Sequence, residues 1–577
     1  MSKETGDLGP VQRAGGSRSP TLSGDKKEKA QDYHSDMDLE ATHVRGIETS
    51  VDTALHRGLK ARHITMIAIG GAIGTGLIIG TGKALAQAGP GSIFISYSII
   101  GFVVFLVMAA LGEMCSWLPM SAGFTGYASR FCDPSLGFAL GWLYWIKYII
   151  VVPNQLTAAA LVISFWLPRE RVNPGVWITI FLVMIICINY FGVRFFGEFE
   201  FWLSSFKVVV IVGVILLTLI IACGGADGNP RGFEYWRDPG AFKPYILEGA
   251  AGKFLGLWST MVTATFAYLG TELVGVTVGE AQNPRKTIPR AIKLTFYRIV
   301  FFYCISILLI GMCVPYNSEE LAFATKASSS ANASPFVVAV RLAGIPVLDH
   351  ILNGCILVFV FSAANSDLYI ANRTLYGLAS DGSAPAIFRR TNRKGVPVYA
   401  LALSSVFGLL AYLNVADDSK EVFTHFTNLV SIFGLLTWIS ILTTHIWFVR
   451  ARRAQGMADA MMPYTAPLGL WGSYGALAMC CLVALTKNYD VFVGDFSTKY
   501  DTFITGYLGI PLYLMLIFGH KLWTKSRGVK PHECDFYTGK DVIDREEEQF
   551  LAAKAEREAG KTNKGGKFYK TWVSWLF

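Results

Sequence analysis

The chain contains twelve long apolar runs between about residues 64 and 523, and this series restricts the fold more than any other feature. At 1.5 Å per residue, each run is long enough to cross a hydrocarbon layer of roughly 30 Å as a helix. Of the 577 residues, 52% are hydrophobic and only 16% are charged. The runs are 64–86, 92–117, 137–166, 175–193, 199–222, 254–280, 292–314, 347–375, 397–414, 424–449, 467–486 and 504–523. The sequence therefore predicts an all-α polytopic membrane protein with twelve transmembrane helices.

Basic residues concentrate in the loops that follow the sixth, eighth and tenth runs. They are Arg285, Lys286, Arg290 and Lys293, then Arg389, Arg390, Arg393 and Lys394, then Arg450, Arg452 and Arg453. Lys and Arg accumulate in short cytoplasmic loops, so these loops and both termini are predicted to be cytoplasmic. This topology explains the net charge of +9, and we expect no nucleic acid partner.

The two ends of the chain are polar tails outside a twelve-span domain of residues 62–523. Residues 1–61 and 524–577 contain few large apolar side chains, which predicts disordered cytoplasmic tails. The first tail lacks the pattern of a cleavable signal peptide. Ubiquitin-ligase or trafficking partners are expected to act on the tails. Asn332 forms a glycosylation sequon on a predicted outer loop, a signal weakened by Pro335.

Two similar pentapeptides stand in the first and sixth runs. Residues 73–77 read IGTGL, and residues 269–273 read LGTEL. Glycines beside a small hydroxyl residue, in the middle of corresponding spans, predict broken helices in an inverted-repeat transporter. For the glycine-rich first run, close packing between membrane helices is the alternative. The matching pentapeptide in the sixth run favours the break.

Broken helices at these positions would expose backbone groups in the middle of the membrane. The half-helix after Gly76 would point its amides, with their partial positive charge, at a cavity where they suit a carboxylate. The carbonyls near Ala72, and those near Phe266 and Leu269, would accept hydrogen bonds from an ammonium group. Receptors for both charges a few ångströms apart fit an α-amino acid.

Five motifs in a fixed order carry a resemblance to a known family. They are GGAIGTGLIIGTG at 70–82, MSAGFTGYASRFCDPSLGFALGW at 120–142, FGEFEFWLSSFK at 196–207, GTELVGVTVGEAQNPRKTIPRAI at 270–292 and NSDLYIANRTLYGLASDGSAPAIF at 365–388. From about residue 57 to 530 the chain resembles the fungal amino acid permeases of the amino acid, polyamine and organocation superfamily. The resemblance implies a LeuT-like five-plus-five inverted repeat with broken spans 1 and 6. Residues 62–222 and 253–449 are the implied repeats, and 467–523 contain two further spans.

The same resemblance implies a substrate site and an energy source. The implied substrate-binding residues are Ala72, Gly74, Thr75, Gly76, Phe266 and Leu269. Gly74, Thr75 and Gly76 are expected to bind the carboxylate. The other three are expected to contribute carbonyls for the ammonium group, with the Phe266 ring as a lid. The family drives uptake with protons, so no cofactor and no metal ion are expected.

Gln155 in the third span is the expected substrate-selecting residue. Many relatives that take neutral or cationic amino acids have a glutamate there, and a carboxylate at this position would repel an acidic side chain. The pattern looks most like the dicarboxylic amino acid permeases, which take glutamate and aspartate. The alternative is that Gln155 only packs against a neighbour. Asn154 and Lys147 complete the predicted selectivity residues, although a Lys147 ammonium in water near the cytoplasmic end of the span is the slightly favoured interpretation.

Lys207 in the fifth span is the first candidate for proton coupling. The resemblance places a lysine here in relatives that do not use sodium, where its ammonium can replace the charge of a bound cation. A permanently charged structural lysine beside Ser362 is the alternative. Glu272 is the rival proton carrier, or it fastens the sixth span to a neighbouring helix.

Further polar residues carry weaker expectations. Those expected near the cytoplasmic mouth, as an inner gate or, for the two basic residues, as surface pairs, are Glu198, Glu200, Glu280, Arg285 and Lys286. Polar residues inside apolar runs to which the sequence assigns no role are Asp367, His425 and Ser431.

The combined expectation is a proton-coupled symporter that imports L-amino acids across the plasma membrane and prefers glutamate and aspartate. Its expected partners are the amino acid, protons and the lipid bilayer. A broad-range permease is the first alternative. An amino acid sensor without flux is the second, although the tails of about 60 and 54 residues are short for a sensor. An enzyme is not expected, because the sequence has no metal-ligand cluster, nucleophile elbow or phosphate loop.

Overall fold

The computed structural model describes residues 74–120, 122–226, 228–276, 284–321, 334–416, 419–493 and 499–559. All of these residues belong to the larger of two compact units, which covers residues 48–577. The regular structure in these ranges is helical and includes no β-strand. The predicted N-terminal tail, Ala72, Glu280 and Asn332 lie outside the described residues.

Nine helical stretches among the described residues are long and apolar enough to cross a membrane, which confirms the polytopic all-α class. They are Pro90–Trp117, Pro134–Ile163, Phe195–Ala222, Ile288–Cys313, Leu348–Ser380, Val398–Val415, Glu421–Ala454, Gly469–Thr486 and Tyr500–Thr524. The expected fourth span corresponds to the shorter α7 (Pro174–Tyr190). The sixth span is an interrupted helix, described below, and the described part of the first span begins at Gly74. The total of twelve spans stays a prediction.

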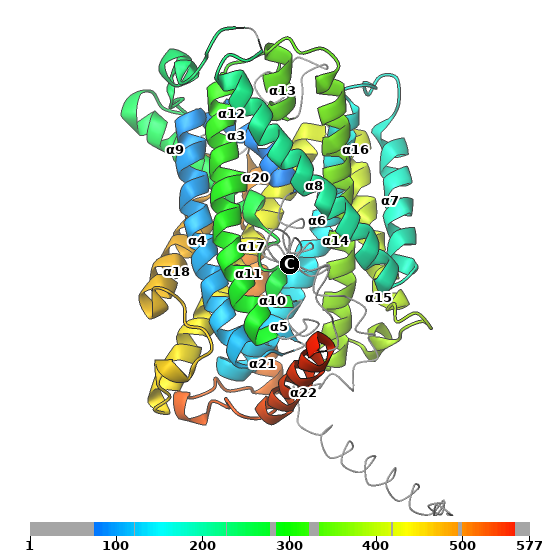
Figure 1. Cartoon of the computed structure of the whole chain (residues 1–577), viewed down its shortest axis with the longest axis vertical. Coiled ribbons are helices and arrows are strands. Elements are labelled where there is room, and N and C mark those ends of the chain that lie inside the picture. Colours follow the sequence, from blue (N-terminus) through cyan, green and yellow to red (C-terminus); the bar gives the residue numbers. More distant parts are fainter. Residues whose placement is uncertain are drawn as a thin grey trace, which may run out of the picture. The chain divides into compact units, whose positions relative to one another are not determined.

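The helix α6 (Pro134–Ile163) occupies the centre of the bundle, and 94% of its most apolar stretch of 18 residues is buried. It packs against α14 (Leu348–Ser380), α17 (Ser419–Ala454) and α21 (Gly509–Thr524). The corresponding stretch of Tyr500–Thr524 is only 17% buried, so its apolar side chains are available to contact lipid. Figure 1 shows the long helices side by side along one axis.

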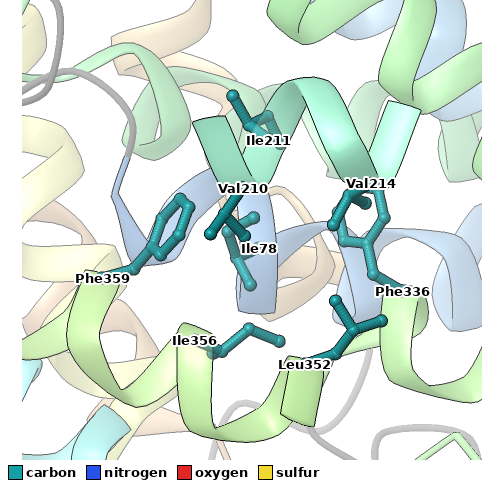
Figure 2. A pocket seen from close by; sticks show the side chains of 8 residues that line it. All are labelled: Ile78, Val210, Ile211, Val214, Phe336, Leu352, Ile356 and Phe359. Atoms are coloured by element: carbon teal, nitrogen blue, oxygen red, sulfur yellow. The ribbon is translucent and has the colours of Figure 1, made fainter. Parts of the chain in front are cut away.

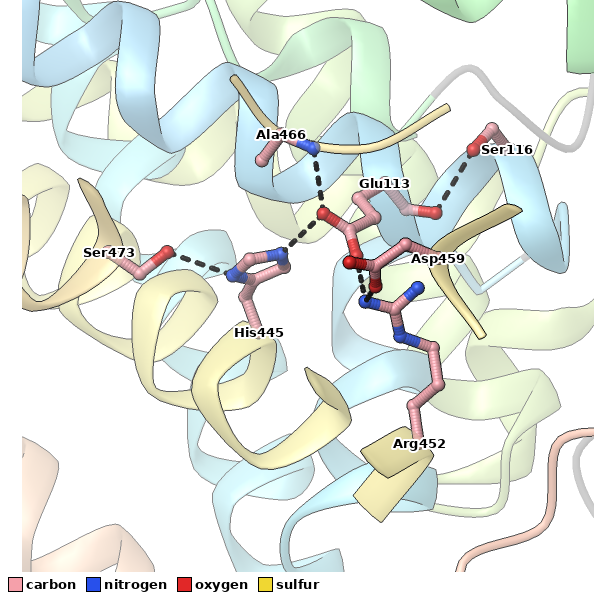
Figure 3. Close-up of polar contacts among 7 residues, drawn as sticks. All are labelled: Glu113, Ser116, His445, Arg452, Asp459, Ala466 and Ser473. Atoms are coloured by element: carbon pink, nitrogen blue, oxygen red, sulfur yellow. Dashed lines mark hydrogen bonds and ion pairs between the residues drawn. The ribbon is translucent and has the colours of Figure 1, made fainter. Parts of the chain in front are cut away.

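A buried polar cluster joins α4 (Pro90–Trp117) to α17 at one end of the bundle (Figure 3). One carboxylate oxygen of Glu113 accepts a hydrogen bond from the Ala466 amide at 2.8 Å and lies 3.2 Å from His445 Nε2. The other oxygen lies 3.5 Å from an Arg452 guanidinium nitrogen. His445 Nδ1 in turn lies 2.8 Å from Ser473 Oγ in α18 (Gly469–Thr486). Since buried charges need partners, this cluster fixes α4 against α17.

The C-terminal segment contradicts the predicted disordered tail over residues 525–559. It contains η9 (Pro531–Glu533) and α22 (Lys540–Ala559), and Figure 1 shows α22, in red, lying across the ends of the long helices. Phe536 has no exposed surface, and its ring stacks on Phe131 with 5.5 Å between centroids. Its carbonyl accepts a hydrogen bond from Trp117 Nε1 at 3.1 Å. The composition of the segment did not predict this docking, because a single buried aromatic side chain, Phe536, makes much of the contact.

Charged contacts also attach this segment to the bundle. Arg130 of α5 (Gly123–Phe131) lies 3.0 Å from Asp535. Arg285 of α11 (Pro284–Arg298) lies 2.5 Å from Asp544 and 3.0 Å from Glu547 in α22. Arg285 therefore forms interhelical pairs with the C-terminal segment, as the surface-pair alternative expected.

Replacing Phe536 with alanine is expected to release this segment. Loss of a buried Phe side chain costs about 3–5 kcal/mol, and here the cost falls on local docking rather than on the spans. Limited proteolysis of the purified protein should therefore cut residues 525–559 much faster. Tyr537→Ala is the matched control, because Tyr537 is 55% exposed. Equal cleavage of both variants would contradict the anchoring role of Phe536.

Candidate substrate site

The sixth span is broken at the predicted pentapeptide. The helix α9 (Gly249–Tyr268) ends at Leu269, whose backbone is extended with φ −61° and ψ 144°. Gly270 follows with φ +94°, a conformation that favours glycine. Helical structure resumes as α10 (Leu273–Val276). The LGTEL sequence therefore forms the interruption, as expected.

Protein groups satisfy the polar backbone at this break. Glu272 Oε2 accepts a hydrogen bond from the Gly270 amide at 3.1 Å. The Tyr303 hydroxyl donates to the Ala267 carbonyl at 3.2 Å. The Phe266 carbonyl, an expected receptor for the ammonium group, accepts from the Leu269 amide at 3.3 Å and keeps a second lone pair. An interrupted helix in a membrane requires such partners, because an unpaired backbone group there costs several kcal/mol.

The glycines of the first span have two different roles. The described chain enters at Gly74, followed by Thr75 and the π-helical turn η1 (Gly76–Gly80). A Cβ on Gly76 would lie 2.4 Å from Ala267 Cα, so this glycine allows the first span to touch the interrupted sixth span. Among the described residues, no atom lies within 4 Å of a Cβ built on Gly74. The close-packing alternative therefore holds for Gly76.

A small cavity lies between the described start of the first span, the interrupted sixth span and the helices α6 and α14. Its lining residues are Gly74, Thr75, Gly76, Lys147, Tyr148, Val151, Gln155, Phe266, Ala267, Leu269, Gly270, Ala363, Asp367 and Val430. The cavity volume is about 30 Å³. One water needs about 10–15 Å³ on the same measure, so the space suits about two waters. The surrounding side chains must therefore move apart before an amino acid fits.

The structure brings most of the sequence-predicted site residues to this cavity. Gly74, Thr75, Gly76, Gln155, Phe266, Leu269 and Lys147 all line it. Asn154 does not line it: its side chain is fully buried in α6, and its amide has no hydrogen-bond partner within the described residues. Phe266, the expected lid, is 6% exposed and meets the Phe423 ring edge-on at 6.0 Å between centroids.

Lys147 is buried and paired, so the favoured interpretation of an ammonium in water was wrong. Its side chain is 1% exposed, and its Nζ forms an ion pair with Glu272 Oε1. The Tyr144 and Tyr148 rings each lie 4.7 Å from the same ammonium. Trp438 of α17 donates to Glu272 Oε2 at 3.4 Å. Glu272 therefore fastens the broken sixth span to α6 and α17, which the sequence offered as an alternative.

A chain of hydrogen bonds crosses the cavity from the first span to α14. Thr75 Oγ1 donates to Gln155 Oε1 at 2.8 Å. Gln155 Nε2 donates to Asp367 Oδ2 at 3.0 Å. Gln155 is thus held by partners at both ends of its amide, and Asp367 joins a site to which the sequence did not assign it. The one available signal was an ionisable residue inside an apolar run.

Lys207 lies outside the cavity lining, in a second buried ion pair. Its Nζ is 3.6 Å from Glu200 Oε1, and both side chains have no exposed surface. The two residues lie in α8 (Val193–Ala222), and the Ser362 hydroxyl of α14 donates to the same Glu200 oxygen at 2.7 Å. Glu200, expected near the cytoplasmic mouth, is the fully buried partner of Lys207. Ser362 contacts the pair through Glu200.

A second cavity has no polar lining. It lies between η1, α8, α13 (Pro335–Leu342) and α14, with a volume of about 10 Å³. Figure 2 shows the eight side chains around it, Ile78, Val210, Ile211, Val214, Phe336, Leu352, Ile356 and Phe359. A space of this size barely admits one water and offers it no partner. It is therefore unsuited to an ion or a zwitterion.

Comparison with known proteins agrees with this geometry. Residues 63–532 match the model of the family described as amino acid permease. The chain belongs to the amino acid permease family. The permease is 53% identical over 532 residues to the dicarboxylic amino acid permease of Saccharomyces cerevisiae, covering 91% of this chain and 87% of that protein. It is therefore a multi-pass membrane transporter.

Other relatives carry names for different substrates. The permease is 40% identical to a proline-specific permease of Emericella nidulans, covering 86% of this chain and 91% of that protein. It is 39% identical to the lysine-specific permease of Saccharomyces cerevisiae, covering 82% and 77%. A crystal structure of a variant manganese transporter from Eremococcus coleocola matches with TM-score 0.51 and 13% identity, covering 84% of this chain and 98% of that chain. At that identity the likeness shows the LeuT-like fold alone.

Proposed function

We propose that the permease is a proton-coupled symporter that imports L-amino acids across the plasma membrane, with glutamate and aspartate preferred. The observation that carries this proposal is the cavity between the first span and the break in the sixth, in which Gln155 and Lys147 stand beside the groups expected to bind an amino acid. The dicarboxylic permease at 53% identity supports the acidic preference. Both termini are proposed to be cytoplasmic.

The proposed binding mode uses the break in each span. The substrate carboxylate meets the backbone around Gly74, Thr75 and Gly76, where a helix start offers amide donors. The ammonium group meets carbonyls of Phe266 and Leu269. The side chain then extends toward Gln155 and Lys147, where an amide donor and a positive charge favour a carboxylate.

The two buried ion pairs define the setting for proton coupling. Lys207 is paired with Glu200 and Glu272 is paired with Lys147, so each of these buried charges has an opposite charge beside it. We propose that the pairs hold fixed charges around the site.

Competition against labelled L-glutamate uptake tests the substrate range. The assay uses cells that lack their own amino acid permeases, at acidic and neutral pH. Aspartate should compete strongly while lysine and leucine do not, and uptake should fall at neutral pH. Equal competition by all of them would make this a broad-range permease. Binding without flux in proteoliposomes would make it a sensor.

Gln155→Glu is expected to depress glutamate uptake about 100-fold, far more than uptake of a neutral amino acid, because like charges in a buried site cost several kcal/mol. The new carboxylate would face Asp367, which now accepts from Gln155 at 3.0 Å, and would repel an acidic substrate. Uptake of both substrates, normalised to surface protein, measures the effect. Gln87→Glu in α3 (Thr81–Ala88), outside the cavity, is the control. An equal loss for both substrates would show that Gln155 does not select the side chain.

A further inference from the structure

Asp367 is the only acidic side chain that lines the cavity within the described residues. It is partly exposed to that space, and its Oδ2 accepts a hydrogen bond from Gln155 Nε2 at 3.0 Å. Through Gln155 it is connected to Thr75 in the first span. Asp367 therefore lies where the side chain of an acidic substrate is proposed to bind.

The charged and titratable groups around Asp367 come from its own helix and from two neighbouring helices. α6 contributes Lys147 and the hydroxyls of Tyr144 and Tyr148, and α8 contributes Lys207 and Glu200. Arg373 lies on α14 itself, with its guanidinium 5.1 Å from the Tyr369 ring. Of the other helices against α14, α7 and α15 (Val398–Phe407) contain no charged residue. In α13 and η5 (Ala386–Arg389) the charged residues are Arg341, paired with Glu320, and the exposed Arg389.

The charges of the two lysines are already balanced. Lys147 is paired with Glu272, and Lys207 is paired with Glu200. An ionised Asp367 therefore adds one negative charge to the group formed by these five residues. An acidic amino acid brings another net negative charge into the same cavity, where low dielectric strengthens the repulsion. A protonated Asp367 removes that repulsion and supplies a hydrogen-bond donor.

We propose that Asp367 binds the coupled proton, and that an acidic substrate occupies the cavity only while this carboxyl is protonated. The proposal rests on the proposed function. A proton from water on one side of the membrane forms an O–H bond on the carboxylate of Asp367. After the site opens to the other side, the substrate leaves and the same O–H bond breaks, releasing the proton to water there. No other bond changes.

The test uses the full chain in proteoliposomes, with labelled L-glutamate uptake and an internal pH dye as readouts. The parent protein should take up glutamate faster at acidic external pH and should acidify the lumen when glutamate is added. Asp367→Asn imitates the protonated carboxyl permanently. It should lose the glutamate-induced acidification, and its ratio of uptake at acidic to neutral pH should fall to one. Glutamate counterflow, which needs no net proton movement, should persist.

Two further variants separate this role from a structural one. Asp367→Glu keeps a carboxyl and should keep the acidification, whereas Asp349→Asn, in the first turn of the same helix, should behave as the parent. If Asp367→Asn is inactive in counterflow, the Asp367→Glu variant tests the proposal instead. Lumen acidification retained in Asp367→Glu supports the proposal, and loss of that acidification overturns it. An unchanged pH ratio and acidification in Asp367→Asn would overturn the proposal and leave the proposed function intact. A parent protein without glutamate flux would overturn both.

Discussion

Lys147→Met is expected to abolish uptake and to lower the stability of the protein by about 3–5 kcal/mol, the usual cost of breaking a buried ion pair. Without Lys147, Glu272 loses its paired cation at a site with no exposed surface. The same carboxylate also accepts from the Gly270 amide at the break. Its loss of a cation therefore disturbs the interruption of the sixth span. Thermal unfolding in detergent and uptake per surface molecule measure the two effects.

A second variant shows whether the charge or the side chain matters. Lys147→Met combined with Glu272→Gln removes both charges, and a glutamine oxygen can still accept from Gly270. Stability should therefore recover, since replacing both partners avoids the unpaired charge. Glutamate uptake should stay low, because the cavity lacks its positive charge. Lys530→Met, at an exposed pair with Glu533, is the surface control and should change neither quantity. A stable and active Lys147→Met variant would show that neither stability nor uptake depends on the ion pair.

Gly76→Ala is expected to separate the first span from the interrupted sixth span. Its Cβ would lie 2.4 Å from Ala267 Cα and 2.8 Å from Ala267 N, and backbone atoms cannot turn away as a side chain does. Overpacking typically costs about 1–3 kcal/mol, and here the cavity walls themselves must shift. We expect uptake to fall at least about tenfold, since small displacements of positioning groups cost that much.

Gly74→Ala is the matched control for this substitution. The added methyl meets nothing within 4 Å, so thermal stability should stay at the parental value. The two alanine variants are compared by unfolding temperature and not by uptake, because a methyl group facing the cavity can alter substrate binding without altering packing. Equal unfolding temperatures for the two alanine variants would contradict the proposed contact between Gly76 and Ala267.

The pattern of the sequence predicted the elements and the break, but not their pairing across the bundle. LGTEL located the interruption correctly, because a glycine beside short polar residues in the middle of an apolar run is typical of a discontinuous membrane helix. Lys147 and Glu272 are both recognisable from the sequence as ionisable residues inside apolar runs. Their contact, across 125 residues of sequence, depends on the rotation of α6 against the sixth span, which helical periodicity does not give.

Three other features were hidden for related reasons. Glu200 stands near the start of an apolar run and was expected near the cytoplasmic mouth, and the sequence did not indicate its pairing with Lys207, seven residues further along the same helix. Asp367 offered no pattern of its own, because its relevance comes from a hydrogen bond to Gln155. The docking of Phe536 likewise depends on the rings of α5 and α17 that receive it.

Gln155 and Asp367, which face the proposed substrate side chain, lie outside the interrupted sixth span, whereas Lys147 both faces that side chain and pairs with Glu272 at the break. Gln155 and Asp367 belong to α6 and α14, and neither helix is interrupted. Glu272 and Tyr303 satisfy the broken backbone independently of them. Substitutions at Gln155 or Asp367 can therefore change which side chain the cavity accepts without altering the backbone contacts at the break.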